Sequence, residues 1–450
     1  MRLQELSITK EINGVIEVPW GADTVQCDSL RIRKSDAALR QLTIRGVTGP
    51  DRQQPRFYCR SAEPKYHLGG TIPARYVAPS FFRMAVDTGH PEIAFENLHI
   101  DGYGGALKLG NSGDYVVRNS YLHHGPDNGI ASANIERLQD SGADSSASFT
   151  LQLCGSEISH YGQSNSKHNL YLHRALGGGR DNPLWMAQGA VNSWSEVLVV
   201  DSLIHSPGWG SAFKSIANKN ILVRNKFFSE LETDPGYPNS ERFSAQMLID
   251  VPACSENIIR GNELHGLKTT KHAGGVALLG LRNRRTAIRG CDIPTAWESG
   301  RLAEAAAPSK VDGAVHQDKY WRDLGGAVLF TTSVEGNYFE VKGAYAHLQT
   351  AVEVAGTYPV YEGSMKQSCL LPTTKSWYER SRVYLKDNHY AGFRGFERIF
   401  RIAPRNHSLL CQNSFQPPGP GPVTTLEKLI DMGSGETYHY QGSNRSMQAR

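Results

Sequence analysis

The segment ISHYGQSNSKHNLYLHR, residues 158–174, has the densest run of hydrogen-bonding and titratable side chains in the sequence. Within it HNLYLH alternates polar and apolar residues, which is the pattern of a half-buried strand. If its two leucines face the core, Asn169, Tyr171 and His173 point outward, and His168 opens the same strand. A phenol and several imidazoles on one exposed surface can exchange protons with a substrate and hydrogen-bond a sugar.

A second polar strand is predicted in GWGSAFKSIANKNILVRN, which aligns with the first by its distance to the following repeated phrase. Placing Phe213 and Ser215 inward leaves Lys214 outward, beside Tyr171 on the neighbouring strand. We therefore expect a polar stripe along one exposed face of the molecule. Its further members, expected to bind substrate together with Asn169 and His173, are Lys108, Asn128, Arg224, Gln246 and Asp250.

The four residues expected to be catalytic each have a structural alternative. His168 is a base or a substrate ligand, or it is bonded to a neighbouring bend, and His205 has the same two interpretations. Tyr171 donates a proton to a leaving oxygen or stacks on a sugar ring. Lys214 neutralises a carboxylate, or acts as a base if neighbouring cations lower its pKa. Asp250 holds a turn or contacts substrate.

These strands belong to a repeat in which two or three apolar residues precede Asn or Asp and a short alternating run. The phrase recurs around Asn97, Asn119, Asp201, Asn225, Asn262, Asn337, Asn388 and Asn413, with Gly155 in the same frame. Its closest intervals are 22, 24 and 25 residues, which suits one turn of a coil of three short strands. An Asn at each bend tolerates the left-handed conformation and can bond to the next coil. The repeat predicts an all-β chain, a right-handed parallel β-helix.

Departures from the repeat suggest the domain limits. We expect N-terminal capping strands and a loop over residues 1–80, the β-helix over 81–415, and a C-terminal tail or cap over 416–450. Within the helix, 266–330 breaks the period and contains a short helical stretch at 298–307. A loop of this length is either a wall or lid over a groove or a surface insertion.

Composition agrees with a solenoid and excludes other classes. Hydrophobic residues make up 39% of the 450, mean hydropathy is −0.42, and 45 Gly and 22 Pro indicate many turns. A net charge of +4, from 48 basic and 44 acidic residues, argues against nucleic acid as the main partner. Seven scattered cysteines without a CxxC pair argue against a zinc site or a disulfide framework, so most are expected to be small buried hydrophobes.

No apolar run is long enough to insert into a membrane, and the first residues lack the apolar core of a signal peptide. We expect a secreted or periplasmic protein in mature form, with an intracellular location as the alternative. No metal or cofactor is expected. The acidic stretch at Glu230, Glu232 and Asp234 is a weaker candidate for Ca²⁺. His123 and His124 are interpreted as part of a solvated bend.

The segments HNLY, SLIHSPGWGSAFKS and LIDVP resemble bacterial right-handed parallel β-helix repeat proteins of the polysaccharide-lyase-like group. The resemblance covers about residues 155–265, and Ile216 stands where that family often has Arg. It implies a β-helix acting on an acidic polysaccharide or oligosaccharide. The residues that it touches are His168, Asn169, Tyr171, His205, Lys214, Ser215 and Asp250.

The leading functional hypothesis is a polysaccharide lyase, which abstracts the C5 proton of a uronic acid and expels the 4-linked oxygen. That reaction needs a cation, a base and an acid within the length of one sugar, and the two polar strands supply these types. A C5 epimerase shares the first step. A glycoside hydrolase would need two facing carboxylates roughly 5–9.5 Å apart. A non-catalytic carbohydrate-binding or tailspike-like protein is the remaining alternative, and the oligomeric state is open.

Overall fold

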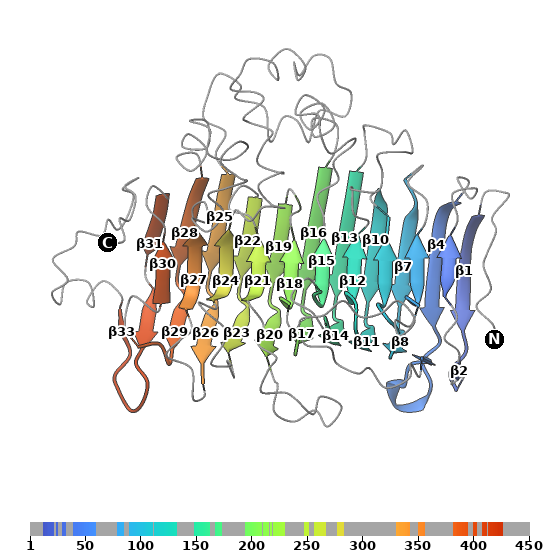
Figure 1. Cartoon of the computed structure of the whole chain (residues 1–450), viewed down its shortest axis with the longest axis horizontal. Coiled ribbons are helices and arrows are strands. Elements are labelled where there is room, and N and C mark those ends of the chain that lie inside the picture. The colour runs from blue at the N-terminus through green and yellow to red at the C-terminus, as the bar shows by residue number, and fades with distance from the viewer. Residues whose placement is uncertain are drawn as a thin grey trace, which may run out of the picture.

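The computed structural model describes three sheets that run the length of the molecule (Figure 1). The described residues are 12–21, 24–25, 29–32, 39–59, 79–84, 90–110, 112–132, 148–162, 167–172, 194–208, 210–215, 217, 219–229, 247–251, 256–266, 277–282, 330–342, 350–355, 381–394, 399–402, 407–411 and 413–425. Besides strands they contain one short 3-10 helix, η1 (Pro50–Arg52). None of their helices is long and apolar enough to cross a membrane.

The strands of each sheet recur once per turn of the chain. Sheet B holds β1 (Ile12–Val18), β4 (Leu39–Gly46), β7 (Glu92–Glu96), β10 (Gly113–Arg118), β13 (Ser148–Cys154), β16 (Trp194–Val200), β19 (Lys219–Val223), β22 (Glu256–Arg260), β25 (Phe330–Glu335), β28 (Ser381–Lys386) and β31 (His407–Cys411). Sheet C holds β2 (Thr24–Val25), β5 (Arg56–Tyr58), β8 (His99–Asp101), β11 (Tyr121–Gly125), β14 (Glu157–Tyr161), β17 (Leu203–His205), β20 (Lys226–Ser229), β23 (Glu263–Gly266), β26 (Tyr338–Val341), β29 (His389–Ala391), β32 (Ser414–Gln416) and β33 (Thr424–Thr425). Sheet A holds β3 (Leu30–Ile32), β6 (Phe82–Met84), β9 (Leu107–Leu109), β12 (Ile130–Ser132), β15 (Leu170–Leu172), β18 (Phe213–Ser215), β21 (Met247–Val251), β24 (Ala277–Arg282), β27 (Thr350–Ala355) and β30 (Phe400–Ile402).

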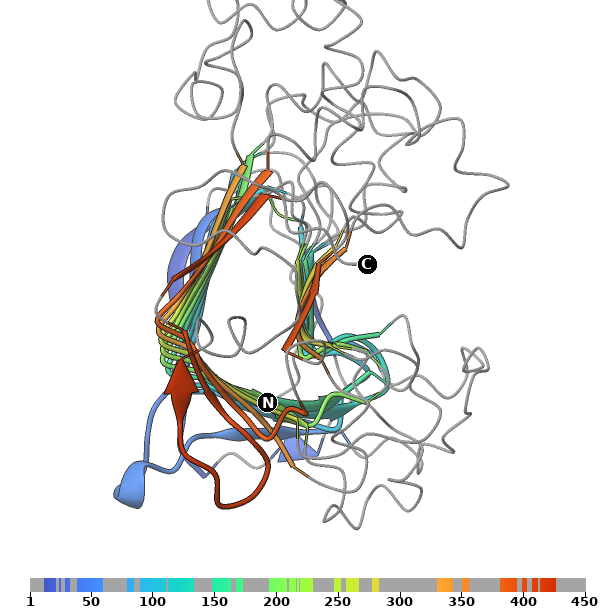
Figure 2. The same ribbon diagram turned by 90° about the vertical axis from the view of Figure 1, so that its left-hand side faces the viewer.

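Each turn runs from sheet B through sheet C to sheet A, and its strands pair in parallel with those of the turns before and after it. The exception is β33, which pairs antiparallel with β32. Seen along its axis, the stack is a three-walled tube (Figure 2). The predicted right-handed parallel β-helix is therefore confirmed, with the crossover handedness that parallel strands require.

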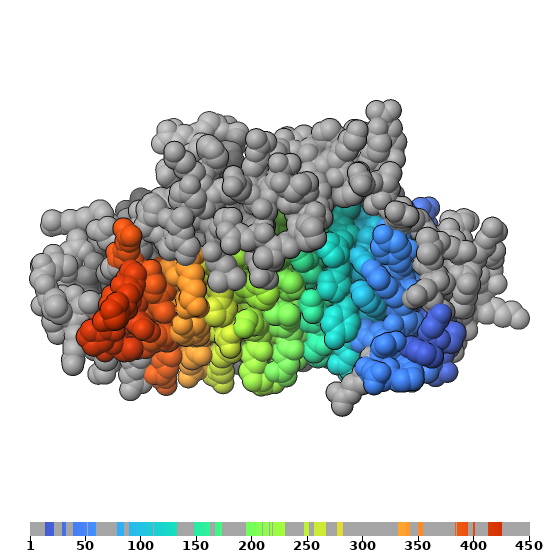
Figure 3. Space-filling view, turned by 90° about the horizontal axis from the view of Figure 1, so that it is seen from below, coloured from blue at the N-terminus to red at the C-terminus, as the bar shows by residue number. Residues whose placement is uncertain are grey.

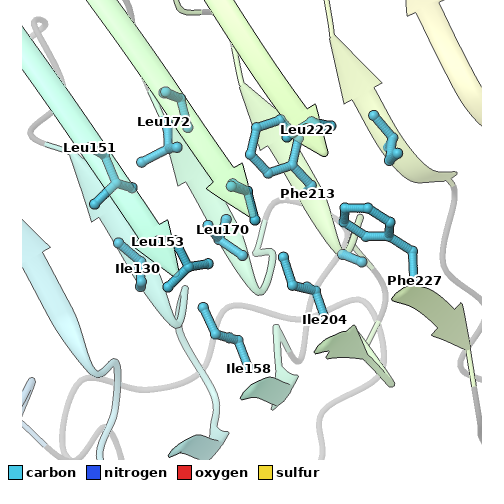
Figure 4. Packing of buried hydrophobic residues seen from close by; sticks show 14 of the residues in the cluster. Ile130, Leu151, Leu153, Ile158, Leu170, Leu172, Ile204, Phe213, Leu222 and Phe227 are labelled. Atoms are coloured by element: carbon cyan, nitrogen blue, oxygen red, sulfur yellow. The ribbon is translucent and has the colours of Figure 1, made fainter. Parts of the chain in front are cut away.

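The core is a set of apolar columns inside the tube. Because alternate side chains point inward, Ile130, Leu170, Phe213 and Ile249 come into register on four successive strands of sheet A, and all four are fully buried. Leu151, Ile158 and other side chains from the other two walls meet them (Figure 4). Full burial of each such side chain contributes about 1.5–3 kcal/mol, so the columns hold the three sheets together.

The bend between sheets B and C uses two adjacent positions, not one. The first is left-handed, at Asn97, Asn119, Gly155, Asp201 and Arg224, with φ of 55°, 47°, 55°, 50° and 54°. The second is buried, and from β19 onward it is occupied by the asparagines of a ladder, Asn225, Asn262, Asn337, Asn388 and Asn413. The repeat seen in the sequence places the left-handed and the buried residues at a single position. They separate because the exposed position selects residues that tolerate positive φ, whereas the buried one needs an amide to satisfy backbone groups.

The expected limits of the helix can be compared with the strands. Strands β1 to β5 precede residue 80 and stack in parallel on the same three sheets, so the first turns lie within the expected N-terminal cap. Strand β33 lies in the expected C-terminal segment. Most of 266–330, including the expected helix at 298–307, lies outside the described residues. Cys59 is disulfide-bonded, which corrects the expectation for that cysteine, and Cys154 is a free thiol.

Candidate functional site

The outer face of sheet A carries one column of residues, with one member on each strand from β3 to β27. Strand register places these residues in direct succession. They point outward because the residues on either side of them point into the core. We call this set the sheet A column, and it consists of Arg31, Arg83, Lys108, Ala131, Tyr171, Lys214, Asp250, Gly280 and Glu353.

Tyr171 and Lys214 are register partners at the middle of the column, as the spacing predicted. The Lys214 ammonium lies 4.9 Å from the centre of the Tyr171 ring, which is a cation–π contact. Both side chains are half-buried. The contact fixes a phenol and a cation next to each other on the outer face.

Two carboxylates follow directly along the same column. Asp250 is the register partner of Lys214, and Glu353 lies two strands further on. Gly280 stands between the two carboxylates and has no side chain to fill the gap. Asp250 is 4% exposed and Glu353 7% exposed, so both acids are withdrawn from bulk water. Charged side chains are rarely buried to this extent unless they are paired.

The corner between sheets C and A flanks the column with a second group of charges. Asp127 accepts Lys108 Nζ at 2.8 Å and Lys167 Nζ at 2.6 Å, one on each carboxylate oxygen. Burial alone would raise the pKa of Asp127, but the two ammonium groups outweigh it and hold the pKa below its ordinary value. This ion triad ties three successive turns together beside Tyr171.

His168 lies in this corner, and its surroundings favour the structural interpretation. The ring Nδ1 of His168 accepts a 2.7 Å hydrogen bond from the Ser211 backbone N–H. The backbone N–H of His168 donates to Asn128 Oδ1 at 2.7 Å. The ring is almost fully buried, 5.0 Å from the Tyr171 ring. Because Nδ1 accepts the Ser211 N–H, the neutral ring carries its proton on Nε2. The ring packs against Tyr171.

Asn169 does not point outward, so that part of the prediction is wrong. Its amide is fully buried, accepts from the Tyr161 N–H at 3.1 Å, and donates to the carbonyls of Ile158 and His205. Asn169 precedes the first residue of β15, where the alternation of the strand has not yet begun. Asn128 is also buried, with its oxygen on the His168 N–H. Both side chains stabilise the corner.

The remaining expected residues lie elsewhere. His205 is on the outer face of sheet C, where its Nε2 lies 3.1 Å from Glu157 Oε1. Arg224 is at the bend between sheets B and C, with its guanidinium on Asp201 at 2.7 Å, so it does not join the sheet A column. His173 and Gln246 lie outside the described residues.

Sequence reasoning missed Glu353, and it named His123, His124 and His205 without placing them together on sheet C. Glu353 lies in TAVEVA, whose alternation marks it as outward, but long insertions hid its alignment with Asp250. Within the part of the chain that the structure describes, no group of three or more His, Cys, Asp or Glu is arranged to hold a metal ion. The acidic stretch at 230–234 falls outside that part.

No protein-family model matches the sequence, and no curated protein sequence matches it. Among solved structures, the chain is similar to a DFA-IIIase from Arthrobacter chlorophenolicus, crystallised without its lid in complex with GF2. The two are 10% identical with a TM-score of 0.35, over 91% of this chain and 89% of that chain. At that TM-score the likeness supports neither a fold nor an activity, and the β-helix follows from the strand register alone.

Proposed function

We propose that the protein is a glycan-cleaving enzyme whose substrate lies along the sheet A column, and that it cleaves by hydrolysis with Asp250 and Glu353 as the acid–base pair. The observation that carries this proposal is the order Lys214, Asp250, Gly280, Glu353 on successive strands. It places two buried carboxylates on one face, with a glycine between them.

The spacing of the two acids favours one stereochemical course. Neighbouring strands are about 4.8 Å apart, so the Cα atoms of Asp250 and Glu353, two strands apart, are separated by roughly 9.6 Å. Inverting glycosidases hold their carboxyl groups about 6.5–9.5 Å apart, because a water molecule must fit between the base and the sugar, whereas retaining enzymes hold them at about 5–5.5 Å. Gly280, the register partner of both acids, adds no side chain to the space between them. Hydrolysis with inversion is the outcome expected from this geometry.

The charges of the column favour an acidic glycan as the substrate. Arg31 and Arg83 are exposed register partners, and Lys108 follows on the next strand. Lys108 is neutralised by Asp127, but like charges on directly opposite residues destabilise a sheet, so the exposed Arg31 and Arg83 pair favours an anion lying over it. Tyr171 contacts the His168 ring and the Lys214 ammonium, and its phenol can hydrogen-bond a sugar hydroxyl.

β-Elimination is the second candidate, and the contact between Lys214 and Tyr171 is the observation that favours it. The Lys214 ammonium, 4.9 Å from the Tyr171 ring, neutralises the uronate, and the Tyr171 oxygen takes the C5 proton as base and donates a proton to the leaving oxygen as acid. A C5 epimerase would use the same pair. In this reaction Asp250 and Glu353 would bind substrate without transferring protons.

One assay separates the candidates. The protein is incubated with polygalacturonate, alginate and hyaluronate while reducing ends, unsaturated-uronate absorbance and the anomer first released are followed. Hydrolysis with inversion raises reducing ends without absorbance and gives the inverted anomer, whereas elimination raises both signals. Asp250→Asn and Glu353→Gln should each lower hydrolysis at least about a hundredfold. Glu92→Gln, an exposed carboxylate on sheet B, is the matched control and should leave turnover unchanged.

A further inference from the structure

The outer face of sheet C carries a continuous row of aromatic and imidazole rings that the proposed cleavage site does not use. His99 and His123 are 5.4 Å apart, centre to centre, and Tyr121 stacks on His123 at 6.1 Å. His124 and His160 stack at 4.7 Å with their planes 16° apart. His160 then meets His205 at 5.6 Å. We call this set, His99, Tyr121, His123, His124, His160 and His205, the imidazole strip.

Hydrogen bonds fix the orientation of these rings. Ser159 Oγ, which is fully buried, lies 2.8 Å from His123 Nδ1 and 2.9 Å from His160 Nδ1. His124 Nδ1 is 3.2 Å from Asp101, and His205 Nε2 is 3.1 Å from Glu157. Because the rotamers are already set, a ligand that packs on the strip would lose little side-chain entropy on binding.

The strip lies on an open face of the helix. The view from below shows successive turns as adjoining bands that follow one another along the underside, where the strands of sheet C lie (Figure 3). Tyr121 is 43% exposed, and the His124 side chain is 45% exposed. Tyr121 and His124 are therefore open to a ligand from solution, whereas the His123 and His205 side chains are only 16% and 12% exposed and support them.

The charge of the strip differs from that of the sheet A column. From β8 to β17 the outward positions of sheet C hold two carboxylates, Asp101 and Glu157. Asp101 is ion-paired with Arg56 on the adjacent β5, and Glu157 is hydrogen-bonded to His205. Burial lowers the pKa of His123 to about 4, so this ring is neutral at pH 7. The strip consequently offers rings, hydrogen-bonding nitrogens and carboxylate oxygens, and the guanidinium beside it is already neutralised by Asp101.

We propose that the imidazole strip is a second saccharide-binding surface, which takes a neutral glycan chain. The apolar faces of sugar rings pack on flat aromatic rings, and their hydroxyl groups donate to carboxylates and exchange hydrogen bonds with imidazole nitrogens. Strands repeat about every 4.8 Å, which is comparable with the length of one sugar residue. A chain running along the helix axis thus meets a new ring on each turn. Because its two carboxylates are already paired with Arg56 and His205, the strip carries no excess positive charge to hold a uronate chain.

The test is affinity electrophoresis of the full chain in gels containing β-glucan, galactomannan or arabinoxylan, with polygalacturonate as the acidic comparison. We expect at least one neutral glycan to retard the protein. The double variant Tyr121→Ala, His124→Asn should bind that glycan at least tenfold more weakly, with its thermal unfolding midpoint unchanged. Asn is chosen because His124 has a φ of 55°, which Asn tolerates. Tyr121→Ala alone serves as the second variant should the double variant fold poorly.

Two controls keep this result separate from the cleavage site. Trp20→Ala removes an exposed aromatic ring outside the strip and should leave the retardation unchanged. Asp250→Asn should also leave neutral-glycan binding unchanged, whether or not the protein cleaves glycans. The proposal is overturned if none of the three neutral glycans retards the protein, or if the Tyr121 variants bind them as the unaltered protein does.

Discussion

Replacement of Asn337 by Ala should destabilise the helix more than its size suggests, because the side chain bonds in both directions along the ladder. Its Oδ1 accepts from the N–H and from Nδ2 of Asn262, at 2.8 and 3.0 Å. Its Nδ2 donates to the Ile259 carbonyl at 2.8 Å and to Asn388 Oδ1 at 3.0 Å. Asn388 Oδ1 keeps a second donor, the Asn337 N–H, and Asn262 Nδ2 keeps the Leu222 carbonyl.

The change therefore removes the side-chain partners of two buried backbone groups, the Asn262 N–H and the Ile259 carbonyl. Each such loss costs about 1–3 kcal/mol, so Asn337→Ala should lower the free energy of unfolding by about 2–6 kcal/mol. Urea unfolding followed by circular dichroism measures the shift. Asn119→Gly, at an exposed left-handed bend, is the control and should cost only a few tenths of a kcal/mol or nothing. A loss at Asn337 no larger than that of the control would refute this account of the ladder.

Three other predictions follow from the same contacts. Burial lowers the pKa of His123 to about 4, whereas an unfolded histidine titrates near 6.5. The neutral ring therefore contributes up to about 3 kcal/mol to the free energy of unfolding above pH 6.5, and this contribution is lost as the pH falls towards 4. His123→Gln should flatten that part of a plot of unfolding midpoint against pH, and an unchanged slope would exclude His123 as its cause. Gly210→Ala should lower the thermal unfolding midpoint, because an added Cβ would lie 1.8 Å from the Lys167 carbonyl oxygen. The expected loss in the free energy of unfolding is about 1–3 kcal/mol. A midpoint equal to that of the unaltered protein would contradict this close approach. Lys214→Met should raise the KM for an acidic glycan at least fivefold with no loss of folding, and an unchanged KM would place the substrate elsewhere.

The fold could be predicted because its repeat is local. Each turn repeats an apolar run and a bend residue within the chain, and the repeat intervals are visible wherever loops are short. What the repeat could not show is that the bend has two functions, one exposed and left-handed and one buried and hydrogen-bonded. Asn can occupy either position, so Asn119 and Asn337 look alike in sequence although only Asn337 belongs to the ladder.

The site was predicted only where turns are closely spaced. Lys214 falls beside Tyr171 because the two strands align by their distance to the next bend. Glu353 was missed because more than a hundred residues separate it from Asp250 along the chain, although only β24 lies between their strands. The imidazole strip has the same origin, since His99 and His205 belong to one surface only once the register of sheet C is known.

The most direct test of the proposed function is the turnover of Asp250→Asn and Glu353→Gln on an acidic glycan that the unaltered protein cleaves, measured as reducing ends with the Glu92→Gln control alongside. Each variant should fold normally, bind the glycan, and turn it over at least about a hundredfold more slowly, while Glu92→Gln keeps full activity. Near-normal turnover in both site variants would contradict the assignment of the two buried carboxylates as the acid–base pair.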